Sequence, residues 1–136
     1  MTAEGYILVV DDDDDIREAI IMVLDQEGHR AVGLRDGLQA LEWLRTQAPP
    51  SLILLDLMMP RFSGADLMQR RRCDPALEAI PIVVMSGGCG ARAMALAMGA
   101  TDCLEKPMEA DALIDAVDRH APVLRAGGSA PDQNRS

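Results

Sequence analysis

Residues 7–15 read Ile-Leu-Val-Val-Asp-Asp-Asp-Asp-Asp, an apolar run followed by five consecutive aspartates. A short, uninterrupted apolar run is typical of a strand that is buried on both faces of a parallel sheet. Such a strand would bring Asp11 and Asp12 to its carboxyl end. Carboxylates that lie close together repel each other, so their clustering indicates a bound hard cation such as Mg2+, which prefers oxygen ligands. We assign residues 13–15 to the start of a helix, where acids interact favourably with the helix dipole.

Polar side chains also follow three other short segments. Asp56 comes directly after the apolar run 52–55, and Ser86 directly after the run 82–85. Lys106 follows a further short segment that we expect to be a strand. A carboxylate, a hydroxyl and an ammonium group at neighbouring strand ends can hold a metal ion and a phosphoryl group together. The pattern therefore predicts a combined phosphate and metal site.

Strand and helix patterns alternate along the chain. Residues 16–24 carry apolar side chains at helical spacing, and Gly28 is expected to end that helix in the left-handed conformation. The expected strands are 7–10, 31–34, 52–56, 82–85 and 102–105, and later helices are expected at 65–72, 91–98 and 109–120. This alternation predicts an α/β fold, a doubly wound (βα)5 parallel sheet in the order 2-1-3-4-5. In such sheets a ligand lies beyond the carboxyl ends of the strands.

The composition limits the possible functions. The 136 residues suit one domain, which we expect to span residues 1–125, followed by a disordered tail, 126–136. The net charge of −9 and the scarcity of aromatic residues argue against binding to nucleic acid or to an anionic membrane. No apolar run approaches the roughly 20 residues of a membrane helix, and no signal peptide is visible. The three cysteines have no ligand spacing, so we expect a reducing, cytoplasmic location.

Five motifs together resemble the receiver domain of two-component response regulators, over about residues 5–121. The motifs are Val9-Val10-Asp11-Asp12, Leu54-Leu55-Asp56-Leu57-Met58-Met59-Pro60 with Gly64, Val84-Met85-Ser86-Gly87, Gly99-Ala100-Thr101-Asp102, and Lys106-Pro107. Five motifs in this order are far more specific than any one of them. The resemblance implies a flavodoxin-like fold and a signalling protein rather than an enzyme.

The resemblance also implies a role for each matched position. Asp56 would be the phosphoacceptor, which receives a phosphoryl group from a histidine kinase or a histidine phosphotransfer protein. The implied Mg2+ ligands are Asp11, Asp12, Asp56 and the backbone carbonyl of Met58. Ser86 and Lys106 would bind the phosphoryl group and act as the switch. The output would be phosphorylation-dependent binding of a downstream protein in trans, by a monomer or weak homodimer, unless the chain is a fragment of a longer protein.

Two features depart from the family pattern and keep alternatives open. Cys103 stands three residues before Lys106, where receivers usually carry an aromatic switch residue, and the segment 86–99 is about two residues short and contains four glycines. These departures leave open a receiver-like interaction module that works without phosphorylation. A less favoured alternative is an aspartate-nucleophile phosphohydrolase, which the pattern Asp12-x-Asp14 faintly suggests.

Other charged residues are given structural interpretations. Arg70-Arg71-Arg72 could form a patch that binds a partner, but a solvated helix end is the favoured interpretation. His29 and His120 have no evident partner in the sequence, so neither is expected to act as a ligand or a base.

Overall fold

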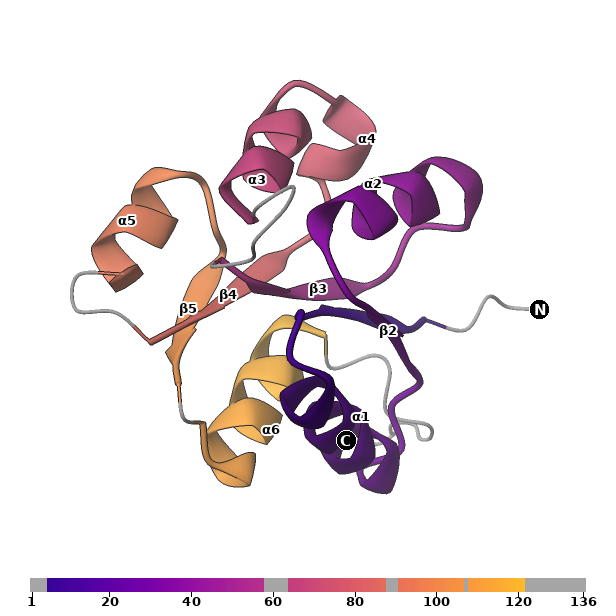
Figure 1. The fold of residues 1–136 in the computed structure, drawn as a ribbon, viewed down its shortest axis with the longest axis vertical. Coiled ribbons are helices and arrows are strands. Elements are labelled where there is room, and N and C mark those ends of the chain that lie inside the picture. The colour runs from indigo at the N-terminus through magenta and orange to yellow at the C-terminus, as the bar shows by residue number, and fades with distance from the viewer. Residues whose placement is uncertain (1–4, 58–63, 88–90, 107, 122–136) are drawn as a thin grey trace, which may run out of the picture.

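The strands of the computed structural model form one parallel sheet of five strands, in the order β2-β1-β3-β4-β5 (Figure 1). The structure describes residues 5–57, 64–87, 91–106 and 108–121. In chain order the elements are β1 (Ile7–Val10), α1 (Asp14–Gln26), β2 (Ala31–Leu34), α2 (Gly37–Thr46), β3 (Leu52–Asp56), α3 (Gly64–Arg72), α4 (Pro75–Glu78), β4 (Ile82–Ser86), α5 (Ala91–Ala97), β5 (Asp102–Glu105) and α6 (Ala110–His120). The predicted strand order is confirmed, and each predicted strand agrees with the observed one to within one residue.

The two faces of the sheet are covered by different helices. Helices α2, α3, α4 and α5 lie over one face, and α1 and α6 lie over the other (Figure 1). In β1, Leu8 and Val10 belong to the hydrophobic core on the side of α2 to α5. Ile7 and Val9 belong to the core on the side of α1 and α6. All four side chains are fully buried. This two-sided burial explains why the strand is an unbroken apolar run rather than an alternating one.

Helix α1 begins and ends where the sequence predicts. The side chain of Asp13 caps its first turn by accepting a hydrogen bond from the amide of Ile16 at 3.1 Å. Asp14 and Asp15 then lie in the first turn, where the helix dipole favours acids. At the other end, Gly28 has a φ of 86°, a left-handed conformation that side chains disfavour. The structure confirms the predicted glycine stop.

One element, the short helix α4, was not predicted from the sequence. It is a single turn that starts with Pro75, and the side chain of Asp74 caps it by accepting from the amide of Ala76 at 3.0 Å. One turn is too short to produce a helical repeat of apolar residues, so only the Asp-Pro start could have indicated it.

The prediction of a solvated helix end is wrong for Arg71. Arg70 and Arg72 are exposed, but Arg71 is buried. Its guanidinium donates to the backbone carbonyls of Ile80 and Gly99 at distances of 2.9–3.1 Å. Burial lowers the pKa of Arg71, although the charge of Glu78 opposes this effect. Arg71 therefore ties α3 to the segments that precede β4 and β5.

No helix among the described residues has both the length and the apolar character required to cross a bilayer.

Candidate functional site

Four predicted site residues lie at the carboxyl edge of the sheet. Asp11 directly follows β1, Asp56 is the last residue of β3, Ser86 is the last residue of β4, and Lys106 directly follows β5. These four strands are consecutive neighbours in the sheet. Because parallel strands end at the same edge, residues far apart in the chain meet there.

Three carboxylates form a cluster at this edge. One oxygen atom from each of Asp11, Asp12 and Asp56 lies within 4.8 Å of the other two. Asp11 is fully buried and Asp56 is 4% exposed, whereas Asp12 is exposed. Two buried carboxylates and one that faces solvent form an oxygen-rich donor set that fits a hard divalent cation with an open side.

Lys106 provides the positive charge opposite these acids. Its Nζ atom lies 3.0 Å from Oδ2 of Asp11 and 3.4 Å from Oδ2 of Asp56. Burial by itself lowers the pKa of Lys106, but the hydrogen bond that Lys106 donates to Asp11 and the charges of Asp56 and Asp11 outweigh burial. The net pKa is therefore raised, and Lys106 stays protonated at neutral pH.

Backbone hydrogen bonds fix the site to the sheet. The amide of Lys106 donates to the carbonyl of Ser86 at 2.9 Å, which joins the ends of β4 and β5. The amide of Asp11 donates to the carbonyl of Leu34 at 3.1 Å, and the amide of Asp13 donates to Oδ1 of Asp11 at 2.9 Å. The Asp11 carboxylate therefore has one oxygen held by a backbone amide and the other by Lys106.

Arg17 is a residue of this site that was not predicted from the sequence. Its guanidinium donates to the backbone carbonyl of Asp11 at 2.9 Å and to Oδ1 of Asp14 at 2.6 Å. The arginine stem passes close over Gly33 of β2, where an added Cβ would lie 3.0 Å from Cδ of Arg17 and 2.7 Å from Cδ1 of Ile21. The missing side chain at Gly33 therefore gives Arg17 room to support the acidic loop.

Of the other predicted site positions, the structure describes some and leaves others outside the described residues. Ser86 is buried at the end of β4, beside the strand that carries Asp56. Met58, the predicted carbonyl ligand, lies outside the described residues, as does Pro107 of the Lys-Pro motif. Cys103, where the resemblance implies an aromatic residue, is buried in the core under α2 to α5. Burial raises the pKa of its thiol, so Cys103 is a small apolar residue there rather than a reactive thiolate.

The expectation that the two histidines have no partner was wrong, whereas the prediction that neither acts as a ligand or a base is not tested by these contacts. His120 has a partner, since its Nε2 atom lies 3.2 Å from Oδ2 of Asp102. His29 is 2% exposed, and its Nε2 atom lies 3.7 Å from Oδ1 of Asp118. Both contacts join segments that are far apart in the sequence, which is why the sequence did not indicate them.

Comparisons with known proteins agree with this geometry. Residues 7–118 match the family model of the response regulator receiver domain. The transcriptional regulatory protein CseB of Streptomyces avermitilis is 33% identical over 136 residues, which cover 98% of this chain and 55% of CseB. The DNA-binding response regulator MtrA of Mycobacterium bovis is 36% identical over 118 residues, which cover 85% of this chain and 50% of MtrA.

Solved structures are similar over most of the chain. A response regulator receiver protein from Pseudomonas putida superposes with a TM-score of 0.79 at 31% identity, covering 88% of this chain and 99% of that one. The signal receiver domain of a signal transduction histidine kinase from Syntrophus aciditrophicus gives a TM-score of 0.80 at 26% identity, covering 96% and 99%.

The parallel sheet in this strand order defines a flavodoxin-like fold, and acids and a lysine lie together at its carboxyl edge. Because the family match spans nearly all of the described residues, the chain belongs to the response regulator receiver family of two-component signalling. The chain spans about half the length of the curated relatives named above. DNA binding is stated in the name of MtrA and belongs to that protein, so the absence of nucleic-acid binding here stays a prediction.

Proposed function

We propose that Asp56 accepts a phosphoryl group from the phosphohistidine of a kinase or phosphotransfer protein, and that the product alters the binding of a downstream protein. The observation that carries this proposal is the placement of Asp56. Its carboxylate is buried within a cluster of acids and lies 3.4 Å from the ammonium group of Lys106. Phosphoryl transfer requires an aligned nucleophile and nearby positive charge, and this site supports both requirements.

Each residue of the site would have a separate role in the phosphoryl transfer. An oxygen of Asp56 attacks phosphorus, the P–N bond of phosphohistidine breaks, and its electron pair returns to the imidazole. Lys106 neutralises part of the charge on the transferred group, and the Ser86 hydroxyl donates a hydrogen bond to it. A Mg2+ ion bound by Asp11, Asp12, Asp56 and the carbonyl of Met58 would supply further neutralising charge to the phosphoryl oxygens. The product is an acyl phosphate on Asp56.

The direct test is the intact mass of the protein after incubation with acetyl phosphate, a small phosphodonor. With Mg2+ present, we expect the mass to rise by one phosphoryl group. Chelation of Mg2+ with EDTA is expected to prevent the gain, because the acid cluster would then lack its cation. A gain that is equally fast in EDTA would contradict the metal-assisted mechanism.

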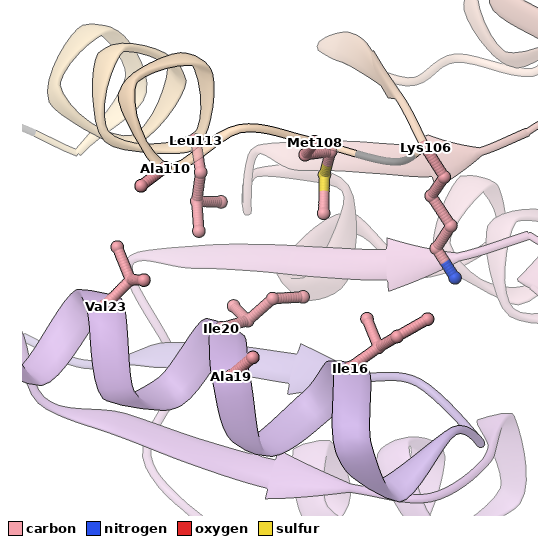
Figure 2. A pocket seen from close by; sticks show the side chains of 8 residues that line it. All are labelled: Ile16, Ala19, Ile20, Val23, Lys106, Met108, Ala110 and Leu113. Atoms are coloured by element: carbon pink, nitrogen blue, oxygen red, sulfur yellow. The ribbon is translucent and has the colours of Figure 1, made fainter.

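An apolar groove beside the site supports docking of the phosphodonor protein (Figure 2). The groove has a volume of about 380 Å³ and lies between α1 and α6, with Lys106 at one end. It is lined by Ile16, Ala19, Ile20, Val23, Lys106, Met108, Ala110 and Leu113. An amphipathic helix that carries the phosphohistidine could lay its apolar face in this groove and bring its phosphoryl group to Asp56.

A charge placed in the groove is expected to slow phosphorylation by a histidine kinase but not phosphorylation by acetyl phosphate. Ala19 lines the groove and is exposed, so Ala19→Glu leaves the core intact but puts a carboxylate against an apolar partner. With a histidine kinase that phosphorylates the wild type, transfer should fall about tenfold or more, as expected for a buried unpaired charge at an interface. Phosphorylation by acetyl phosphate should be unchanged.

The matched control is Ala76→Glu, which alters an exposed alanine of α4 on the opposite face of the sheet. We expect this variant to behave as the wild type with both donors. Equal losses in the two variants would contradict docking in the groove. A cytoplasmic location and a monomeric or weakly dimeric state remain predictions of this proposal.

A further inference from the structure

The guanidinium of Arg17 joins the first turn of α1 to the loop that carries two of the proposed metal ligands. Its Nη1 atom donates to the backbone carbonyl of Asp11 at 2.9 Å, and its Nη2 atom donates to Oδ1 of Asp14 at 2.6 Å. The side chain is only 13% exposed, although arginine is mostly a solvent-exposed residue. Two hydrogen bonds and this burial hold the guanidinium in one place.

The carbonyl that Arg17 binds belongs to the peptide group that connects Asp11 to Asp12. A peptide group is planar, so a hydrogen bond to its oxygen restrains the whole plane and the direction of the next residue. Asp11 is fully buried, and both of its carboxylate oxygens accept hydrogen bonds. Asp12 is exposed, so its orientation depends mainly on the backbone. Arg17 therefore controls how Asp12 is directed relative to Asp11.

A glycine in the neighbouring strand makes the position of Arg17 possible. Gly33 of β2 pairs with Val9 of β1 and lies beneath the arginine stem. A Cβ at Gly33 would lie 3.0 Å from Cδ of Arg17 and 2.7 Å from Cδ1 of Ile21. Both distances are shorter than the roughly 3.5–4.0 Å at which carbon atoms pack best. The contact between Arg17 and the acidic loop therefore depends on the missing side chain at Gly33.

We propose that Arg17 is a positioning residue for Mg2+, which holds the peptide group between Asp11 and Asp12 so that both carboxylates can reach one ion. This inference rests on the function proposed above, because it concerns the same metal site. Loss of a residue that orients metal ligands typically lowers metal affinity by about 10–100-fold. Arg17 holds the backbone rather than a ligating oxygen, so we expect the lower end of this range, about tenfold.

The charge of Arg17 and its hydrogen bond to the loop have opposite effects on Mg2+ affinity. A cation near the site repels Mg2+, so loss of the charge alone would tighten Mg2+ binding. Asp14 pairs with that charge and is 68% exposed, so solvent screens most of the remaining effect. Loss of the hydrogen bond frees the peptide group and weakens Mg2+ binding. We expect the second effect to dominate, which gives Arg17→Gln a sign that charge alone cannot produce.

The affinity for Mg2+ is measurable without phosphorylation, from the free energy of urea unfolding at increasing Mg2+ concentrations. An ion that binds only the folded chain raises this free energy once its concentration exceeds Kd. In Arg17→Gln, we expect the rise to require about tenfold more Mg2+ than in the wild type. Arg35→Gln is the matched control, because Arg35 is exposed and follows β2 at the same edge of the sheet. Its Mg2+ affinity should equal or slightly exceed that of the wild type.

Gly33→Ala tests the geometry while it leaves the guanidinium of Arg17 present. The added methyl group would displace the arginine stem, so Mg2+ affinity should fall as it does in Arg17→Gln. In a protein that already carries Arg17→Gln, the methyl group should cause little further loss, because no guanidinium remains to be displaced. Additive losses in the double variant would overturn the proposal, since Gly33 would then act on Mg2+ by another route.

Phosphorylation by acetyl phosphate separates a role in Mg2+ affinity from a role in the chemistry. Arg17→Gln should gain the phosphoryl group more slowly than the wild type at low Mg2+, but at nearly the wild-type rate at saturating Mg2+. A rate that stays low at saturating Mg2+ would overturn the proposal. So would an Mg2+ affinity in Arg17→Gln that equals or exceeds that of the wild type.

The same measurements distinguish failure of this inference from failure of the proposed function. If Mg2+ affinity depends on Arg17 as expected but the wild type gains no phosphoryl group, the proposed function fails and the role of Arg17 stands. If the wild type is phosphorylated and Arg17→Gln binds Mg2+ as well as the wild type, the role of Arg17 alone fails. If Mg2+ does not stabilise the wild type at all, the metal site and the role of Arg17 fail together.

Discussion

Asp56→Asn is expected to abolish phosphorylation and at the same time to stabilise the folded protein. The amide lacks the nucleophilic oxygen of the carboxylate, so incubation with acetyl phosphate and Mg2+ should leave the intact mass unchanged. Stability should rise because Asp11 and Asp56 are both buried and share the single ammonium group of Lys106. Removal of one of two like charges relieves their repulsion, and we expect a gain of about 1 kcal/mol in the free energy of unfolding.

Urea unfolding of both proteins measures that gain, and Asp115→Asn, which neutralises an exposed acid, is the control. We expect the control to be phosphorylated normally and to have nearly the stability of the wild type. A phosphoryl gain that persists in Asp56→Asn would place the acceptor elsewhere. A loss of stability in Asp56→Asn would assign its carboxylate a structural role instead.

Lys106→Met is expected to destabilise the protein strongly in the absence of metal. The substitution leaves the buried carboxylates of Asp11 and Asp56 without their cation. Removal of one member of a buried ion pair costs about 3–5 kcal/mol, and we expect the lower end because the Lys106 side chain is 20% exposed. Mg2+ should restore part of this loss, because it returns positive charge to the cluster and binds only the folded chain.

The pH dependence of this difference has a definite sign. The pKa of Lys106 is raised in the folded state, so its stabilising contribution is fully present below the ordinary value of 10.5. The contribution is lost as the pH rises through the higher pKa of the folded state. The free energies of unfolding of wild type and Lys106→Met should therefore converge only above pH 10.5. Convergence near neutral pH would contradict the ion pairs.

Strands β1, β3 and β4 were predictable from the sequence because each contains an apolar run whose end is marked by a polar residue. The same property placed Asp11, Asp56 and Ser86 at one edge of the sheet. Lys106 follows β5, which is not an apolar run, so its place depended on the alternation of strands and helices. Alternation of strands and helices then left few possible strand orders. Local patterns of a few residues were therefore sufficient for the fold and for the centre of the site.

The contacts that the sequence did not reveal all depend on tertiary packing. Arg71 lies in a run of three arginines, which is typical of a solvated helix end. The carbonyls that it binds, however, belong to segments that follow its own helix in the chain. Arg17 reaches Asp11 because β2 has a glycine beneath it, and one glycine in a strand has many possible reasons. The partners of Asp102 lie on two different helices, at positions that no spacing rule connects.

The geometry weighs against the phosphohydrolase alternative. That interpretation requires the pattern Asp12-x-Asp14 to supply two acids to the site. Asp14 instead pairs with Arg17 at 2.6 Å, and its side chain is 68% exposed. Asp56 takes the place in the cluster that Asp14 would need. The other alternative is a receiver-like interaction module that works without phosphorylation. A test for phosphorylation of Asp56 distinguishes it from the proposed function.

The most direct test of the central claim is to locate the phosphoryl group itself. Wild-type protein treated with Mg2+ and acetyl phosphate would be reduced with borohydride, which converts an acyl phosphate into a primary alcohol, and the peptides would then be mapped by mass spectrometry. The account predicts one converted residue, with Asp56 reduced to homoserine. Conversion at Asp12, or a phosphoryl gain that yields no converted aspartate, would contradict it.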